Sequence, residues 1–214
     1  MSEISEKNEI RQSAKYKTAR KILGRLYLNI EKAKEFGFPH FEHFKQMCDD
    51  FKEKWEEAKK ASKILRGLRT YSFEPSREYS SMSKMLAYLG LVESLGVALA
   101  DMVLILLIAN GTEVHTRGPM TKHVTKAREL ENIDLVYKLD FLEDEGLDLF
   151  GEFINRDVRN HIAHLKFTIR GNGEIRKRDG SPIDIDENIS EFWVCVDTLM
   201  LVFEDIGLLK WFEK

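Results

Sequence analysis

The N-terminal part of the chain shows apolar residues at intervals of three and four, the spacing typical of amphipathic helices. One helix is predicted over residues 4–36, with an apolar face of Ile22, Leu23, Leu26, Ile30 and Ala33. The segment "EFGFPH" interrupts it, because Gly37 favours a helix end and Pro39 a helix start. A second helix is predicted over residues 40–69, so the two form an antiparallel helical hairpin.

The most apolar segment is "LAYLGLVESLGVALADMVLILLIA", residues 86–109, in a helix predicted from Arg77 to Asn110. Glu93 and Asp101 interrupt this segment, and its uncharged runs are shorter than the roughly 18 residues that a membrane span needs. The pattern therefore predicts a helix buried in a bundle, without membrane association. The dipeptide "NG" ends it in the manner of a helix C-terminus.

The second half of the chain continues in helices and then changes period. Helices are predicted over residues 121–145, with a break near Ile133, and over residues 147–165. The following "LKFTIRGNGEIRKRDGSPIDI" alternates and contains "GNG" and "DG", which predicts a small β-hairpin. A last helix begins near Asp186.

These elements predict an all-α fold, an antiparallel helical bundle with a small β-hairpin insertion and a long N-terminal helical hairpin. The segment "TYSFEPSREYS" marks a boundary, so residues 1–75 are interpreted as a helical hairpin extension and residues 76–214 as the bundle.

Composition narrows the class of protein. The chain is 43% hydrophobic and 32% charged, as in globular proteins, and its net charge of -3 means that nucleic acid would have to bind a local basic patch. Cys48 and Cys195 fit no metal-ligand spacing, and we interpret them as reduced thiols. The polar N-terminus shows no secretory signal, so a cytoplasmic location is expected. No cofactor or metal is predicted.

The segment "RDVRNHIAH", residues 156–164, contains several polar side chains of the types that take part in catalysis and phosphate binding. On a helical wheel of residues 147–165, the predicted core-facing stripe is Leu147, Phe150, Ile154, Val158, Ile162 and Leu165. His161 falls at the edge of that stripe, which favours a packed histidine over a catalytic one. Arg159, Asn160 and His164 fall on the opposite side, where Asn160 and His164 stack at a spacing of four.

These residue types suit metal-free cleavage of RNA. The reaction needs a base for the 2′-hydroxyl proton, an acid for the leaving 5′-oxygen and a cation for the charge on phosphorus. Histidine serves as acid or base near neutral pH, and arginine binds phosphate oxygens. Two such helices related by a twofold axis would supply two histidines. The alternative is a solvated helix face with one packed histidine.

The segment "RNHIAH", residues 159–164, resembles the R-x4–6-H motif of the HEPN superfamily. The resemblance implies a small helical bundle with metal-independent ribonuclease activity, and an active site formed where two motif helices meet in a homodimer. It assigns Arg159, Asn160 and His164 as the motif residues and extends over residues 76–214. Lys166 stands where some relatives carry a tyrosine that is modified, so adenylylation of that position is not expected.

Further candidates surround this motif. Leu149 and Phe153 are apolar but lie on the outward side of the wheel, which predicts a contact between two protomers. Glu93, Asp101 and Arg156 are candidate supporting residues; the two carboxylates either orient the motif side chains or only satisfy buried polar groups. A basic group that follows the motif either holds RNA phosphates or protects a strand edge: Lys166, Arg170, Arg176, Lys177 and Arg178.

The sequence thus favours a metal-independent endoribonuclease that leaves a 2′,3′-cyclic phosphate. The resemblance also implies a role as a toxin or defence effector, controlled by an antitoxin or regulatory protein. One alternative is a non-catalytic HEPN-like module that binds a nucleotide or protein through the same groove. Another is a helical scaffold in which the N-terminal hairpin carries the function.

Overall fold

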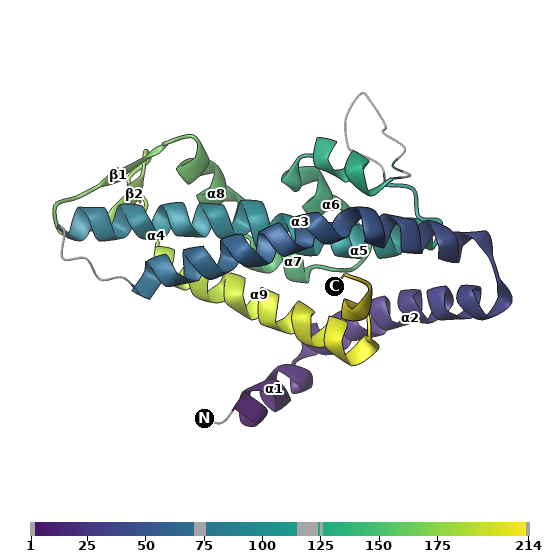
Figure 1. Cartoon of the computed structure of the whole chain (residues 1–214). Helices are drawn as coiled ribbons and strands as arrows, with labels where there is room; N and C mark the ends of the chain where they lie inside the picture. The colour runs from purple at the N-terminus through teal and green to yellow at the C-terminus, as the bar shows by residue number, and fades with distance from the viewer. Residues whose placement is uncertain (1–2, 71–75, 115–123, 125, 213–214) are drawn as a thin grey trace.

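The computed structural model describes residues 3–70, 76–114, 124 and 126–212 (Figure 1). The first two helices are α1 (Glu3–Gln12) and α2 (Ala14–Phe36), separated at Ser13. The prediction of one unbroken helix over residues 4–36 was therefore wrong. Ser13 caps α2, since its hydroxyl oxygen accepts a hydrogen bond of 3.1 Å from the backbone N–H of Tyr16, a group that has no partner inside the helix.

The predicted antiparallel hairpin of α2 and α3 (Pro39–Thr70) is present. Gly37 ends α2 in the left-handed conformation, with φ of 68°, and its backbone N–H returns to the carbonyl groups of the last turn. Pro39 then occupies the first position of α3, where its missing N–H costs nothing. α2 lies against α9, and α3 lies along α4 and α5.

The apolar segment forms a continuous helical stretch of α4 (Arg77–Leu91), a π turn (Val92–Gly96) and α5 (Val97–Ala109). By length and composition alone this stretch would be able to cross a membrane. However, 83% of its most apolar window is buried inside the protein. The stretch is therefore packed as the central helix of the bundle, which is the environment that an all-round apolar helix requires.

The motif region is broken into short helices. Leu135–Asp144 forms α6, after a 3₁₀ turn at Ala127–Asn132, and is followed by α7 (Leu149–Phe153) and α8 (Arg156–Ala163). The prediction of one helix over residues 147–165 was wrong, because Ile154 is extended, with ψ of 91°. Asn155 starts α8 anew, and its side-chain oxygen accepts a hydrogen bond of 3.1 Å from the N–H of Val158.

The β-hairpin is present where the alternation predicted it. β1 (Phe167–Ile169) and β2 (Ile175–Lys177) pair antiparallel, and Phe167 lies opposite Lys177. The hairpin is held on the start of α4, since the Ser81 hydroxyl donates a 2.6 Å hydrogen bond to the carbonyl of Gly173. Gly173 has φ of 85°, and a Cβ there would lie 3.0 Å from the Arg77 Cβ, so this close approach requires glycine.

The chain closes with α9 (Ile185–Ile206), which Asp184 caps, and a 3₁₀ turn (Leu209–Trp211). The all-α fold with a small hairpin is thus confirmed. Buried side chains of α2 and α3 belong to the same hydrophobic core as those of α5 and α9, as Leu23, Trp55, Val103 and Leu199 illustrate. The N-terminal helices therefore pack as part of the bundle, while the predicted boundary near residue 75 lies outside the described residues.

Candidate functional site

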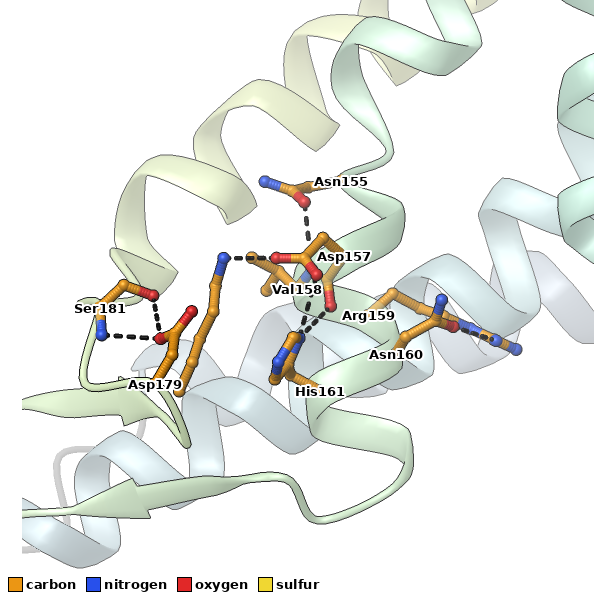
Figure 2. Close-up of polar contacts among 9 residues, drawn as sticks. Asn155, Asp157, Val158, Arg159, Asn160, His161, Asp179 and Ser181 are labelled. Atoms are coloured by element: carbon orange, nitrogen blue, oxygen red, sulfur yellow. Dashed lines mark hydrogen bonds and ion pairs between the residues drawn. The ribbon is translucent and has the colours of Figure 1, made fainter.

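Arg159 is held between two other side chains. Its Nε donates a 2.5 Å hydrogen bond to the Glu93 carboxylate, which also contacts Nη2. Nη1 donates a 2.9 Å hydrogen bond to Oδ1 of Asn160. Figure 2 shows Arg159 and Asn160 extending together on the side of α8 that faces away from the hairpin. The guanidinium therefore has a fixed direction, as a group that binds a phosphate requires.

Glu93 reaches α8 from the π turn of the central helix. Single π turns inside α-helices occur often at functional sites, because the wider turn places side chains where a regular helix would not. The Glu93 side chain is 39% exposed and that of Arg159 is 24% exposed, so the ion pair is open to solvent. Of the candidate supporting residues, Glu93 is the one that contacts the motif.

His164 lies at the C-terminal end of α8, where its backbone N–H donates a 3.1 Å hydrogen bond to the Asn160 carbonyl. This is the last hydrogen bond of the helix, since His164 is the C-cap, with φ of -100° and ψ of 11°. Asn160 and His164 thus lie one turn apart at the end of α8. The imidazole is exposed and makes no hydrogen bond or ion pair with the described residues. It is available to a bound molecule.

Leu165 departs from its prediction as a core residue. It is 70% exposed and adopts the left-handed conformation, with φ of 52°. The N–H of Lys166 then donates a 2.8 Å hydrogen bond to the His161 carbonyl, which closes the end of α8 in the pattern that normally uses glycine. A leucine in this conformation is strained, and the strain lies next to His164.

His161 lies on the other side of α8, toward the hairpin (Figure 2). Its Nδ1 lies 2.8 Å from the Asp157 backbone carbonyl and 3.2 Å from the Asp157 carboxylate. The side chain is 23% exposed, so it is a packed histidine at the interface of helix and hairpin instead of the core edge. Lys177 of β2 donates a hydrogen bond to the Asp157 carboxylate and lowers its pKa. This contact joins the hairpin to the face of α8 that carries His161.

Asp101 and Arg156 do not reach the motif side chains. Asp101 is fully buried, with one carboxylate oxygen 2.6 Å from Lys138 Nζ and the other 2.9 Å from Lys54 Nζ. Burial lowers the pKa of Lys138, against the opposing effect of the Asp101 charge. Arg156 instead pairs with two carboxylates of α6, Asp140 and Glu143. The supporting role predicted for Arg156 was wrong. Asp101 follows the other interpretation that the sequence left open, because it satisfies buried polar groups instead of orienting the motif.

Leu149 and Phe153 are buried within their own chain, with exposed fractions of 5% and 8%. α7 packs against α9, and the first turn of α2 covers Phe153: Lys15 Nζ lies 4.0 Å from the centre of the Phe153 ring and also pairs with Glu152. The prediction that they contact a second protomer was therefore wrong. The wheel indicated correctly that this face is covered, but the cover consists of other helices of the same chain.

The basic residues after the motif divide into two groups. Arg170 and Arg176 pair with Glu174, at 3.5 Å and 2.5 Å, and Lys177 pairs with Asp157. Those three therefore have partners within the chain. The side chains of the other two are exposed and make no hydrogen bond or ion pair with the described part of the chain: Lys166 and Arg178.

Arg159 also lines a surface groove of about 650 Å³ that sequence reasoning missed. Lys54 of α3 and Tyr137 and Lys138 of α6 contribute to it, together with Glu93. No local pattern marks these residues, since they come from three separate segments. Within the described ranges, no three His, Cys, Asp or Glu side chains converge in a way that would hold a metal ion.

Comparison of the chain with protein-family models, with curated proteins and with solved structures gave no match. The site is therefore interpreted from its own chemistry. It offers a fixed guanidinium, an amide and an unpaired imidazole along two turns of one helix. These groups can bind a phosphate and transfer a proton.

Proposed function

We propose that this protein is a metal-independent endoribonuclease of HEPN type that cleaves RNA by attack of the 2′-hydroxyl on the adjacent phosphorus. The observation that carries the proposal is the Arg159 guanidinium, fixed by Glu93 and Asn160 beside the exposed His164. This arrangement has the charge and the titratable group that the reaction needs, and the motif and the all-α fold with its hairpin agree with it.

Each proposed role follows from the chemistry. One imidazole of His164 accepts the 2′-hydroxyl proton while the 2′-oxygen forms its bond to phosphorus. Arg159 stabilises the added negative charge on the phosphorane oxygens. A second imidazole donates a proton to the 5′-oxygen as its bond to phosphorus breaks, which leaves a 2′,3′-cyclic phosphate and a 5′-hydroxyl. Asn160 keeps the guanidinium in position.

The second imidazole requires a homodimer, because each chain supplies one motif histidine. The partner subunit's His164 would face the same phosphate across a twofold axis. Since Leu149 and Phe153 are covered, the contact has to use the open end of α8. Leu165, apolar and 70% exposed beside His164, is the residue that we assign to this contact. Lys166 and Arg178 would then hold flanking phosphates of the RNA.

The proposal includes a cytoplasmic location and a role as toxin or defence effector under the control of an antitoxin or regulatory protein. Cys48 and Cys195 are buried free thiols, and burial raises the pKa of both, so they are protected from oxidation. The central apolar helix is used inside the bundle, which leaves no need for a membrane to cover it.

One observation favours the second candidate function, a non-catalytic module that binds a nucleotide or a protein. Glu93 already compensates the charge of Arg159, and a phosphate has to compete with that carboxylate. In this alternative the groove recognises a ligand without cleaving it.

The test is incubation of the purified protein with total RNA in EDTA. We expect cleavage products with 2′,3′-cyclic phosphate ends, and no cleavage of an oligonucleotide with 2′-deoxyribose throughout. His164→Ala should lower the rate by about a hundredfold to ten-thousandfold at an unchanged Tm, because the side chain is exposed. His40→Ala, which removes another exposed histidine, is the matched control.

Activity that is lost in EDTA and restored by a divalent cation would contradict the mechanism. Equal rates for the wild type and His164→Ala would contradict the assignment of the histidine. RNA binding that depends on Arg159 without any cleavage would support the non-catalytic module.

A further inference from the structure

The outward side of α2 carries positive charge. Residues 11–30 contain no Asp or Glu but include Arg11 in α1 and Lys15, Lys17, Arg20, Lys21 and Arg25 in α2, in a chain of net charge -3. Arg11 pairs with Asp205 and Lys15 with Glu152. Lys17, Lys21 and Arg25 are exposed and make no hydrogen bond or ion pair with the described residues. They follow one another at steps of four residues, about 6 Å along the helix, and like charges at this spacing destabilise an isolated helix.

These cations border a groove of about 590 Å³ between α2 and the end of α9. Gly24, Leu28 and Ile206 supply its apolar lining. Leu28 is 54% exposed, whereas the opposite face of α2 is buried in the hydrophobic core. The groove therefore combines an apolar surface with a basic rim.

Gly24 is the second observation that points to a ligand. It lies in the middle of the 23-residue α2, where glycine is the poorest helix former apart from proline. A Cβ at this position would meet only Ile206 Cγ2, at 3.7 Å, which is ordinary van der Waals contact. Packing of the chain therefore does not require glycine here. A helix position without a side chain does allow the backbone of another molecule to approach closely.

We propose that this groove binds an acidic amphipathic helix of a partner protein. The partner's apolar side chains would lie over Gly24 and against Leu28, and its carboxylates would pair with Lys17, Lys21 and Arg25. An RNA strand would use the cations but would gain nothing from an apolar lining or from a missing Cβ. In Figure 1 α2 lies below the central helix and α8 above it, so this surface is separate from the proposed ribonuclease site.

The experiment uses the full chain and a synthetic helical peptide of roughly 20 residues, about 30 Å long, with Leu on one face and Glu on both flanks. Binding is measured by fluorescence anisotropy at low and at physiological salt. The variant Lys17→Gln/Lys21→Gln/Arg25→Gln removes the rim, and Lys45→Gln/Lys60→Gln/Lys63→Gln removes the same charge from exposed positions of α3 as the control. Gly24→Leu fills the groove.

We expect the rim variant to weaken peptide binding at least tenfold and the α3 control to leave it unchanged. Gly24→Leu should weaken binding by a similar factor while its Tm stays equal to or above that of the wild type, because leucine is the better helix former. A Gly24→Leu variant with an equal or higher Tm and weaker peptide binding would show that the groove binds a ligand, because a purely structural role of Gly24 would not change the binding.

Two outcomes would overturn the inference. One is that the wild type binds the acidic peptide no more tightly than a version with Lys in place of each Glu. The other is that a single-stranded RNA or a vesicle of anionic lipid binds through the three cations and is unaffected by Gly24→Leu, which would assign the surface to that ligand instead. Cleavage of RNA is not measured here, so loss of the proposed nuclease function would leave the result unaffected.

Discussion

Two carboxylates on the central helix, Glu93 and Asp101, differ in every respect except their chemistry. They lie eight residues apart, about 12 Å along the axis, and their ion pairs border the same groove. Glu93 is 39% exposed and meets Arg159 at the surface. Asp101 has no exposed surface and is shared by Lys138, which is 1% exposed, and Lys54.

The difference in burial distinguishes an ion cluster that stabilises the fold from an ion pair that a ligand can reach. Charges removed from water are stabilised only by their partners, so a buried cluster has to remain complete. A half-exposed pair is also solvated by water and contributes little to stability. A ligand can therefore reach its side chains from the solvent. The Glu93–Arg159 pair belongs to the second kind, and the Asp101 cluster to the first.

The largest expected effect is that of Asp101→Ala. The substitution leaves Lys138 buried without its anion, and we expect the free energy of unfolding to fall by about 3–5 kcal/mol. Denaturant unfolding followed by circular dichroism measures it. Adding Lys138→Met should restore much of the loss, while Glu57→Ala, at an exposed position, should change stability by less than about 0.5 kcal/mol. A change below about 1 kcal/mol for Asp101→Ala would remove the distinction between the clusters.

Glu93→Gln should have the reverse profile. Its side chain is half-exposed, so we expect a loss of stability below about 1 kcal/mol. RNA cleavage should fall about tenfold, equivalent to about 1.4 kcal/mol, because the guanidinium is no longer held by a carboxylate. Single-turnover cleavage and thermal unfolding of the same preparation test both parts. An increase in cleavage would mean that Glu93 competes with the phosphate instead of positioning Arg159.

A third ion cluster, between α1 and α9, extends the comparison to pH. Hydrogen bonds from Arg11, and then from the Tyr16 hydroxyl, lower the pKa of Asp205 to about 2. Because the folded-state pKa lies below the unfolded value of about 3.9, the contribution is complete above pH 4 and is lost as the pH falls through about 2.

At neutral pH, Asp205→Asn should therefore be less stable than the wild type by at most about 1 kcal/mol, after allowance for solvent screening. The two unfolding midpoints should converge between about pH 4 and pH 2. Urea unfolding across this range measures the convergence. A constant difference at all pH values would mean that the carboxylate charge is not responsible.

The smallest expected effect concerns the strain beside His164. Leu165→Gly removes a side chain from a left-handed backbone position, which relieves about 1 kcal/mol, and the freer unfolded chain offsets part of the gain. We expect a net stabilisation of a few tenths of a kcal/mol, visible as a small rise in Tm. If Leu165 holds the proposed dimer, sedimentation should show weaker association at the same time. A lower Tm with unchanged association would contradict both assignments.

The sequence alone was sufficient for features whose cause is local. The sequence predicted the helix of residues 39–70, the turn at Gly37 and the hairpin after residue 166. Each depends on a signal that acts within a few residues: the spacing of apolar positions, the conformational freedom of glycine, or the alternation along a strand. The order of Arg159, Asn160 and His164 on one helix was predicted for the same reason. The ability of these three side chains to bind phosphate or transfer a proton follows from residue type and spacing alone.

Only the tertiary structure decided how that helix is positioned and what surrounds it. The cap at Asn155 interrupts a helix that periodicity made continuous, because one side-chain hydrogen bond competes with the helical pattern. Arg159 takes its partner from Glu93, 66 residues away, and Phe153 takes its cover from Lys15. Such contacts depend on which faces meet when the helices pack, and the pattern along a single helix does not encode the identity of its neighbour.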